Sequence, residues 1–245
     1  MPDPRVNRYA QPQRLVQIGR RRKLNVNLSG SGGPTVILSA GGGGSADRIP
    51  RHSSGWGQVL ERMRKEEALR VLDIGPTSSG NINLITALGH SIYLANLVED
   101  AQKPEWVLRN EEGAPAGFDV ERFLDAQLNF SGRGFDIVLF WDSADYLPEP
   151  VLAPILERLH QVMAPGGNLL AMFHSATGSA HAHGADTGFS RYHLTDTSQV
   201  NVQRVGDYPV RQTYTNRQIE KLFAAYKSYR FFLGKDNLRE VIVVR

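Results

Sequence analysis

The chain contains no cysteine among its 245 residues. Disulfide bonds, thiolate nucleophiles and cysteine-ligated zinc are therefore excluded. No apolar run approaches the roughly 18 residues that a membrane-spanning helix requires, and residues 1–17 lack the apolar core of a secretory signal peptide. Together these absences predict a soluble, cytoplasmic protein.

Two common enzyme motifs are also missing. The sequence has no G-x-S-x-G, in which a strained turn exposes a nucleophilic serine, and no phosphate-binding G-x-x-x-x-G-K-[ST]. Residues 32–45, GGPTVILSAGGGGS, look like a strand followed by a glycine-rich loop. Without either motif they indicate neither a serine hydrolase nor a nucleotide site, and we interpret them as part of a loosely packed extension.

Charge is distributed unevenly along the chain. Residues 1–25 carry seven basic side chains and one acidic residue, so the remaining residues have a net negative charge. A nucleic-acid-binding body would show a basic face, and here the excess lies in a tail. We therefore predict a basic, glycine-rich N-terminal extension over residues 1–54 and no nucleic-acid partner. A solvated arm is the favoured interpretation, and contact with phosphates or acidic lipid is the alternative.

From about residue 55, apolar patterns typical of helices and of strands alternate. Amphipathic helices are predicted at residues 56–68, 81–89 and 150–163. Buried strands are predicted at residues 69–75, 90–97, 118–128, 135–147 and 168–175. This alternation predicts an α/β fold with a doubly wound, mostly parallel sheet.

The last third of the chain breaks this alternation. Residues 175–214 are rich in Gly, Ser, His and Thr and are too long for a simple connector, so we treat them as an insert. Because they follow a parallel strand, we expect them to cover a ligand at its carboxyl end. The side chains expected to face that ligand are Phe189, Arg191, Tyr192 and His193. A surface hairpin that makes dimer contacts is the alternative.

The C-terminal segment predicts a different ending for the sheet. Thr215 is expected to cap a helix over residues 215–226. Residues 227–245 contain two apolar segments around a tight KDN turn, which predicts an antiparallel hairpin.

Residues 55–245 resemble the class I S-adenosylmethionine-dependent methyltransferases. The resemblance rests on four segments in the family's order: VLDIG (71–75), FLDAQLNF (123–130), FDIVLFWDSADYL (135–147) and VMAPGGNLLAMF (162–173). It implies a Rossmann-like, seven-stranded sheet with a terminal antiparallel hairpin. It also implies S-adenosylmethionine as cofactor and a small molecule as the methyl acceptor.

The same resemblance implies a set of cofactor-binding residues. Asp73 matches the acid that family members aim at the methionine ammonium, and the backbone at Gly75 approaches the methionine part. Asp125 matches the acceptor for the adenine amino group, with helix capping as its alternative role, and Leu128 lines the adenine slot. Trp141 lies where methionine and acceptor meet.

The sequence departs from the family pattern at two places. Thr77 and Ser79 stand where the family loop has glycines, and their hydroxyls are expected to donate to the cofactor carboxylate. Asn96 stands at the end of the second strand, where the family has an acid for the ribose hydroxyls. Asn96 can still accept and donate hydrogen bonds there.

Three residues are candidates for the chemistry itself. His174 directly follows the last parallel strand and is the expected base, although a strand-end histidine that bonds only backbone is the alternative. Asp142 and Tyr146, together with Asp145, supply the fourth-strand side of the same crevice. A metal site built from His181, His183 and His193 is not expected, because no carboxylate cluster accompanies them.

The sequence thus predicts a methyltransferase that acts on a small molecule and forms a homodimer if the insert makes the contacts. A catalytically degenerate protein of the same fold, serving as a binding or assembly subunit, is the alternative. A nucleic-acid methyltransferase is disfavoured, because the fourth motif reads WDSADY and lacks the proline pair of N-P-P-[YF].

Overall fold

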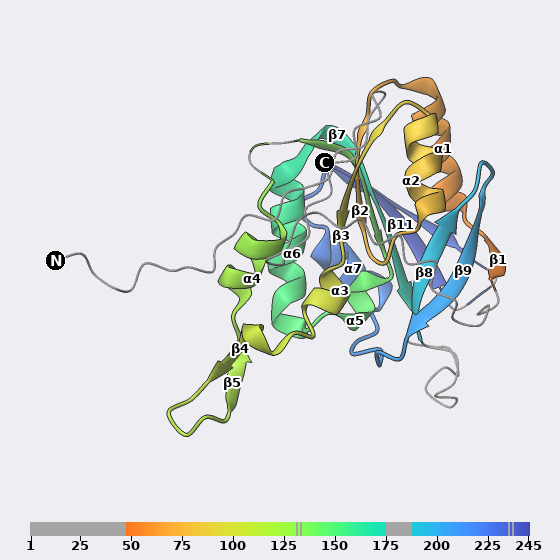
Figure 1. Cartoon of the computed structure of the whole chain (residues 1–245). Coiled ribbons are helices and arrows are strands. Elements are labelled where there is room, and N and C mark those ends of the chain that lie inside the picture. The colour runs from red at the N-terminus through yellow and green to blue at the C-terminus, as the bar shows by residue number, and fades with distance from the viewer. Residues whose placement is uncertain (1–47, 131, 133, 175–187, 235, 237) are drawn as a thin grey trace, which may run out of the picture.

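The computed structural model describes residues 48–130, 132, 134–174, 188–234, 236 and 238–245. Its centre is a six-stranded sheet of strand order β10-β11-β7-β6-β2-β3 (Figure 1). Four neighbouring strands are parallel, namely β7 (Met163–His174), β6 (Phe135–Trp141), β2 (Arg70–Ile74) and β3 (Ser91–Ala95). The sheet ends in an antiparallel hairpin of β11 (Leu238–Val244) and β10 (Ser228–Leu233). The predicted mostly parallel sheet with a terminal hairpin is confirmed.

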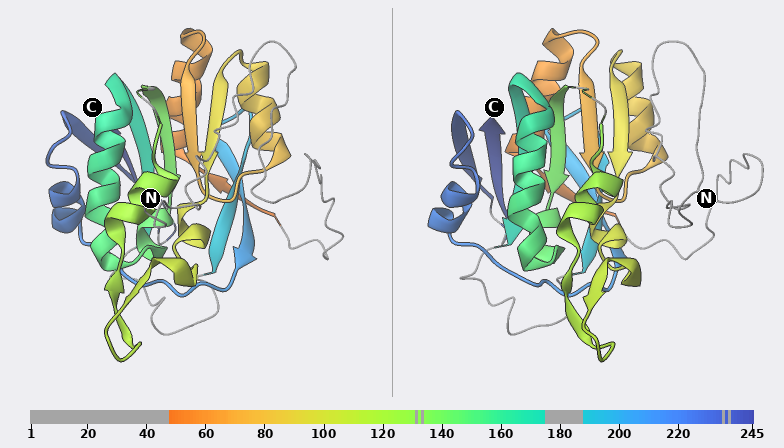
Figure 2. Two further views of the ribbon diagram at one scale, coloured as in Figure 1. Left: turned by 60° about the vertical axis from the view of Figure 1, so that its left-hand side comes forward. Right: turned by 90° about the vertical axis from the view of Figure 1, so that its left-hand side faces the viewer.

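Helices cover both faces of this sheet, as the two views in Figure 2 show. One face packs against α1 (Ser54–Lys65) and α2 (Ser79–Ala87). The other packs against α4 (Val120–Gln127), α6 (Glu149–Val162) and α7 (Asn216–Leu222). Within β2, Val71 packs in the core on the α1 and α2 side, and Leu72 packs in the core on the α4, α6 and α7 side, because successive strand residues point to opposite faces.

Local sequence signals explain where two of these helices begin. The Ser53 hydroxyl accepts from the backbone N–H of Trp56 at the start of α1. At α7, Thr215 and Gln218 form a reciprocal capping box, so the predicted cap is confirmed. Each cap pairs backbone donors that the first helical turn leaves free.

A second, three-stranded antiparallel sheet lies beside the first one (Figure 1). It consists of β1 (Ile49–His52), β9 (Gln199–Gly206) and β8 (Phe189–Leu194). We call it the small sheet. It joins the end of the predicted N-terminal extension to the predicted insert, and it shares a hydrophobic core with α1 and α2.

The predicted strand at residues 118–128 is wrong, because α4 occupies most of it. The Asp119 side chain caps α4 by accepting from the backbone N–H of Arg122, and Phe123, Leu124 and Gln127 are buried at helical spacing. The short hairpin of β4 (Val107–Arg109) and β5 (Pro115–Phe118) precedes it and forms a separate two-stranded sheet. Within the described residues the central sheet therefore has six strands.

Several predictions fall on residues that the structure does not describe. These are the basic tail, the glycine-rich segment 32–45, residues 175–187 of the insert, and His181 and His183. The short helices α3 (Leu97–Asp100), α5 (Ser143–Tyr146) and η1 (Pro104–Trp106) complete the described part. No helix in that part is both long and apolar enough to cross a membrane.

Candidate functional site

Three parallel strands end at the same edge of the central sheet and bring the predicted polar residues together. Asp73 lies near the end of β2, Trp141 and Asp142 at the end of β6, and His174 at the end of β7. In open α/β sheets, ligands bind outside the carboxyl ends of the strands. We call this region the carboxyl edge.

Asp73 is buried and forms a side-chain hydrogen bond with Trp141 of the neighbouring strand β6. Its Oδ1 accepts from the indole Nε1 of Trp141 at 2.8 Å. Its Oδ2 has no well-formed hydrogen bond. Burial raises the pKa of the carboxyl, and the neighbouring polar groups of Thr77, Trp141 and Asn81 oppose that rise.

Trp141 has an unusual backbone conformation for its residue type. Its φ is 50°, in the left-handed region that non-glycine residues rarely adopt. The indole ring stacks on Tyr192 of β8, with ring centroids 4.8 Å apart and an interplanar angle of 6°. Such conformations persist where surrounding contacts hold them, often at functional sites. Here those contacts come from Asp73 and from the small sheet.

The loop between β2 and α2 approaches the same indole ring. Gly75 has a φ of 151°, and a Cβ placed on it would lie 3.5 Å from Cδ1 of Trp141. The Gly75 N–H donates to the carbonyl of Ala95 at 2.7 Å. The backbone conformation therefore favours glycine here, whereas the space beside Trp141 would admit a Cβ at ordinary contact distance.

Thr77 and Ser79, the two residues in the family's glycine positions, differ in environment. The Thr77 hydroxyl oxygen is buried and faces the Asp73 carboxyl. Ser79 is exposed at the start of α2, where the capping role belongs to Ser78. Of the two hydroxyls, only that of Thr77 lies at the site.

Asn81 and Arg191 fasten the small sheet to this loop, and sequence reasoning gave neither of them that role. Asn81 is buried; its Nδ2 donates to the carbonyl of Tyr192 at 2.8 Å, and its Oδ1 accepts from the N–H of Leu194 at 2.9 Å. Nε of Arg191 donates to the carbonyl of Pro76 at 3.0 Å. No local sequence pattern signals these bonds, because they join residues more than a hundred positions apart.

Buried Asp145 and half-buried His174 form a pair at the acceptor side of the edge. Asp145 Oδ2 lies 2.6 Å from Nδ1 of His174 and also accepts from the His174 backbone N–H at 2.7 Å. Burial lowers the pKa of His174, but the hydrogen bond and the charges of Asp145 and Asp142 raise it more, so the net shift is upward. Burial raises the pKa of Asp145, and His174 opposes that rise. With Nδ1 held by Asp145, Nε2 is the nitrogen available to a substrate.

Asp142 is buried next to this pair. The pKa of Asp142 is raised to about 7, mainly by burial. The charge of His174 opposes this rise, and the charge of Asp145 adds to it. A hydrogen bond with the Tyr192 hydroxyl also lowers the pKa. Because burial strongly raises the pKa of Tyr192, this hydroxyl keeps its proton and donates to the carboxylate.

Tyr146 contributes a buried ring to the site. It stands edge-on to the His174 imidazole, with centroids 6.2 Å apart, and edge-on to Phe189 at 5.1 Å. Burial raises the pKa of its hydroxyl, and the charges of Asp142 and Asp145 raise it further. Tyr146 is thus placed as a wall beside His174 and stays protonated.

The remaining predicted cofactor residues lie at different places. Asn96 follows β3 at the carboxyl edge, and its Nδ2 donates to Glu99 while its buried Oδ1 has no partner. Asp125 is on the exposed side of α4, where it pairs with Arg158 at 3.3 Å. The expectation that Asp125 follows a strand or caps a helix is therefore wrong. Leu128 is fully buried in the core.

The unpaired buried polar atoms of the described residues gather at this edge. They are Asp73 Oδ2, Thr77 Oγ1, Asn96 Oδ1, Asp142 Oδ1, Asp145 Oδ1 and Arg239 Nε. Five of these six atoms are oxygens that can accept a hydrogen bond. Buried acceptors normally have donors, so the carboxyl edge is suited to a ligand rich in N–H and O–H groups.

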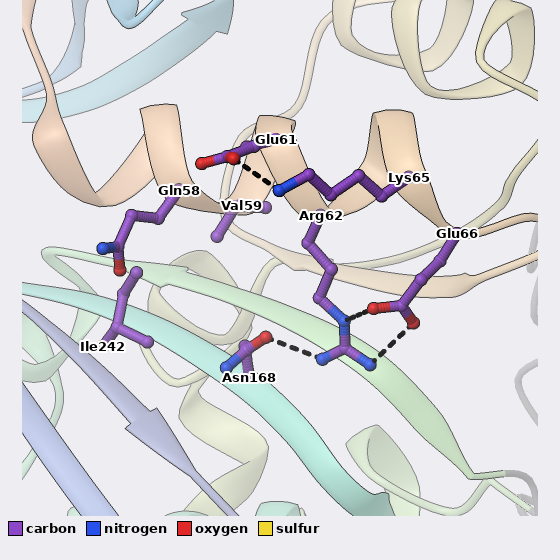
Figure 3. Close-up of a pocket in the computed structure, with 8 residues that line it drawn as sticks. All are labelled: Gln58, Val59, Glu61, Arg62, Lys65, Glu66, Asn168 and Ile242. Atoms are coloured by element: carbon purple, nitrogen blue, oxygen red, sulfur yellow. Dashed lines mark hydrogen bonds and ion pairs between the residues drawn. The ribbon is translucent and has the colours of Figure 1, made fainter.

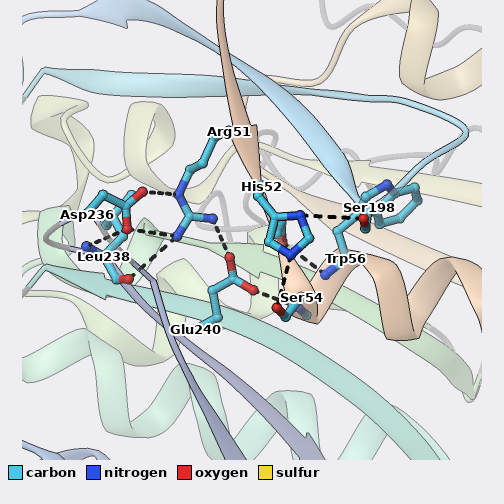
Figure 4. Close-up of polar contacts among 10 residues, drawn as sticks. Arg51, His52, Ser54, Trp56, Ser198, Asp236, Leu238 and Glu240 are labelled. Carbon is cyan, nitrogen blue, oxygen red and sulfur yellow. Dashed lines mark hydrogen bonds and ion pairs between the residues drawn. The ribbon is translucent and has the colours of Figure 1, made fainter.

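Two other polar regions lie away from this edge. A shallow pocket between α1 and the sheet includes Arg62, Glu66 and Asn168, but these side chains already bind one another (Figure 3). Arg51, Asp236 and Glu240 form a closed ion-pair cluster between β1 and the terminal hairpin (Figure 4). No group of three or more potential metal ligands occurs in the described part of the chain.

The sequence matches no described protein family and no curated protein. Among solved structures it is similar to TehB from Haemophilus influenzae (12% identity, TM-score 0.44), over 77% of this chain and 62% of TehB, less than two thirds of that protein. It is also similar to the N-methyltransferase NodS from Bradyrhizobium japonicum (13% identity, TM-score 0.40), over 77% and 93% of the two chains. A third is the 1,6-didemethyltoxoflavin-N1-methyltransferase of Burkholderia thailandensis with S-adenosylhomocysteine (13%, TM-score 0.38), over 78% and 77%. Because these identities and scores are low, the likeness indicates neither an activity nor a substrate for this chain.

Proposed function

We propose that this chain is an S-adenosylmethionine-dependent methyltransferase that acts on a small molecule. The observation that supports it most is the group of unpaired acceptor oxygens at the carboxyl edge. The cofactor carries an ammonium group, a ribose diol and an adenine amino group, which are donors that such oxygens require. The residues present therefore fit this cofactor.

Each part of the proposed cofactor site has a candidate residue. Asp73 would bind the ammonium through Oδ2, because Trp141 already occupies Oδ1. Asn96 would accept from a ribose hydroxyl through its free Oδ1. The Gly75 loop and Thr77 would lie along the methionine part. No adenine contact is proposed for Asp125, since it is on the exposed side of α4.

The acceptor side of the proposal relies on the Asp145–His174 pair. When bound, the cofactor supplies an electrophilic methyl group. Asp145 holds His174 through Nδ1, so that Nε2 can receive a proton from the acceptor. Buried aromatic rings of Trp141, Tyr146 and Tyr192 limit the access of water.

A catalytically degenerate protein of the same fold, acting as a binding or assembly subunit, is the second candidate. The observation that favours it is the bond between Trp141 and Asp73, which takes one of the two oxygens that the ammonium would use. The two candidates differ in whether the cofactor binds and reacts at this edge.

Ligand-induced stabilisation tests the proposal. S-Adenosylmethionine at about 100 times its Kd should stabilise the wild-type protein by about 2.7 kcal/mol. Asp73→Asn should lose most of that gain. Its amide oxygen would face the Trp141 N–H, so its amide nitrogen would stand in the place of Oδ2, and that nitrogen cannot accept from an ammonium. Asp196→Asn, on an exposed turn of the small sheet, is the matched control and should keep it. Equal stabilisation of both variants would contradict the proposed site.

A further inference from the structure

The acidic groups on the acceptor side set a requirement for the molecule that binds there. Asp142 and Asp145 are buried, with exposures of 1% and 0%. Among the described residues, the one ion pair formed by either carboxyl is that of Asp145 with His174. The charge of Arg239 also acts on Asp145, but the two form no ion pair among the described residues. Two buried carboxyls with a single ion pair between them favour a cationic or donor-rich ligand over an anionic one.

The unpaired oxygens at this place narrow the choice of ligand further. Oδ1 of Asp142 and Oδ1 of Asp145 are both buried without a hydrogen-bond partner. A protonated secondary or primary amine offers two or three N–H donors from one atom, whereas a phenol offers one O–H and a carboxylate offers none. An amino group can therefore satisfy both oxygens, and the other two groups cannot.

Aromatic rings border the same acidic groups. Tyr146 stands edge-on to His174, Phe189 packs against Tyr146, and Tyr192 reaches Asp142 through its hydroxyl. Aromatic rings next to carboxylates bind alkyl- and arylammonium groups well, because ring faces attract cations and ring edges pack on carbon.

From this arrangement we propose that the methyl acceptor is a small molecule with a primary or secondary amino group, bound between Asp142, Asp145 and the neighbouring aromatic rings. This inference rests on the proposed function and specifies its substrate class. The bound ammonium first gives one N–H proton to Nε2 of His174, which passes it to solvent. The lone pair freed on nitrogen then forms the new N–C bond as the methyl–sulfur bond breaks and that electron pair stays on sulfur, so the product leaves as a methylated ammonium.

The test uses the full chain and three matched probes: benzylamine, phenol and benzoate. Each is titrated into the cofactor-free protein by calorimetry and then incubated with S-adenosylmethionine, with methylated product measured by mass spectrometry. We expect benzylamine to bind and to be methylated on nitrogen, and the other two probes to do neither. Benzylamine binding should weaken about 10- to 100-fold in Asp142→Asn, because a charge-assisted hydrogen bond is lost. Asp207→Asn, an exposed aspartate paired with Arg204, is the control and should bind normally.

The outcomes separate this inference from the proposed function. Methylation of phenol but not of benzylamine would overturn the amine assignment and leave the methyltransferase proposal standing. Benzylamine binding without any binding of S-adenosylhomocysteine would overturn methyl transfer and reduce the site to amine binding. Equal benzylamine affinity in wild type and Asp142→Asn would overturn the proposed location.

Discussion

Two buried acidic clusters of this protein are built in opposite ways. Glu240, 2% exposed, accepts from the Gly55 backbone N–H at 2.6 Å with one oxygen and from Arg51 with the other (Figure 4). Asp142 and Asp145 each keep a buried oxygen without a partner. The fully paired cluster has no free group to offer a ligand and fastens β1 and α1 to the terminal hairpin. The incompletely paired cluster has acceptors left for one.

The largest expected effect is on turnover at the incompletely paired cluster. In the native protein the charge of Asp145 holds His174 and raises its pKa. Asp145→Asn removes that charge, so methyl transfer to an amine should fall about 10²- to 10⁴-fold. The midpoint of the acidic limb of the pH–rate profile should move to lower pH, since the pKa of His174 falls. Steady-state kinetics across pH measures both. A fall in rate with an unmoved profile would indicate a purely structural role.

The next effect should appear in the stability of the paired cluster. Glu240→Ala leaves Arg51 and the start of α1 without their acceptor, and should cost about 3–5 kcal/mol of unfolding free energy. Asp236→Ala removes the other, more exposed partner of Arg51 and should cost only about 0–1 kcal/mol. Denaturant titration of both variants measures the difference. Similar losses would contradict the contrast between the two partners.

A smaller effect is expected where the small sheet meets α2. Asn81→Ala leaves the carbonyl of Tyr192 and the N–H of Leu194 without partners, at a cost of about 1–3 kcal/mol. Hydrogen exchange at residues 192–194 should become faster. Asn83→Ala, exposed on the same helix, is the control. Unchanged exchange in the Asn81 variant would show that other contacts hold the small sheet.

The last expected effect is a change in the pH dependence of stability, and it is the smallest when taken over a single pH unit. The native Asp142 carboxyl keeps its proton up to about pH 7, whereas its ordinary pKa is 3.8. The native state therefore binds more protons between these values, and its contribution to stability falls as pH rises by up to about 1.4 kcal/mol per pH unit. Asp142→Asn should flatten the measured curve over this window. A curve of unchanged slope would show that Asp142 does not titrate there.

The spacing of apolar residues and the helix-capping residues predicted most of the fold. The features that were not predicted depend mainly on contacts between residues far apart in the sequence. The strands Arg70–Ile74 and Phe135–Trp141 are mostly apolar, with Asp73 and Asp136 as their acidic residues, so their burial was predictable from the sequence. Residues 118–128 contain both apolar and acidic residues, so their pattern fits a strand or a helix. Capping by Asp119 stabilises the helix α4 that the structure shows there. Part of the site was also predictable, because Asp73 and His174 lie at the ends of strands that the sequence predicts. The pairing of Asn81 with β8 joins residues more than a hundred positions apart, and local pattern carries no signal for it.

The central claim is that the unpaired acceptors of the carboxyl edge bind the donors of the cofactor. Titration calorimetry of the wild-type chain with S-adenosylhomocysteine tests it most directly, because no acceptor molecule and no turnover are needed. We expect a saturable one-site heat that is strongly reduced in Asp73→Asn and unchanged in Asp196→Asn. No heat at about 1 mM ligand, which would place binding weaker than about −4 kcal/mol, would contradict the claim.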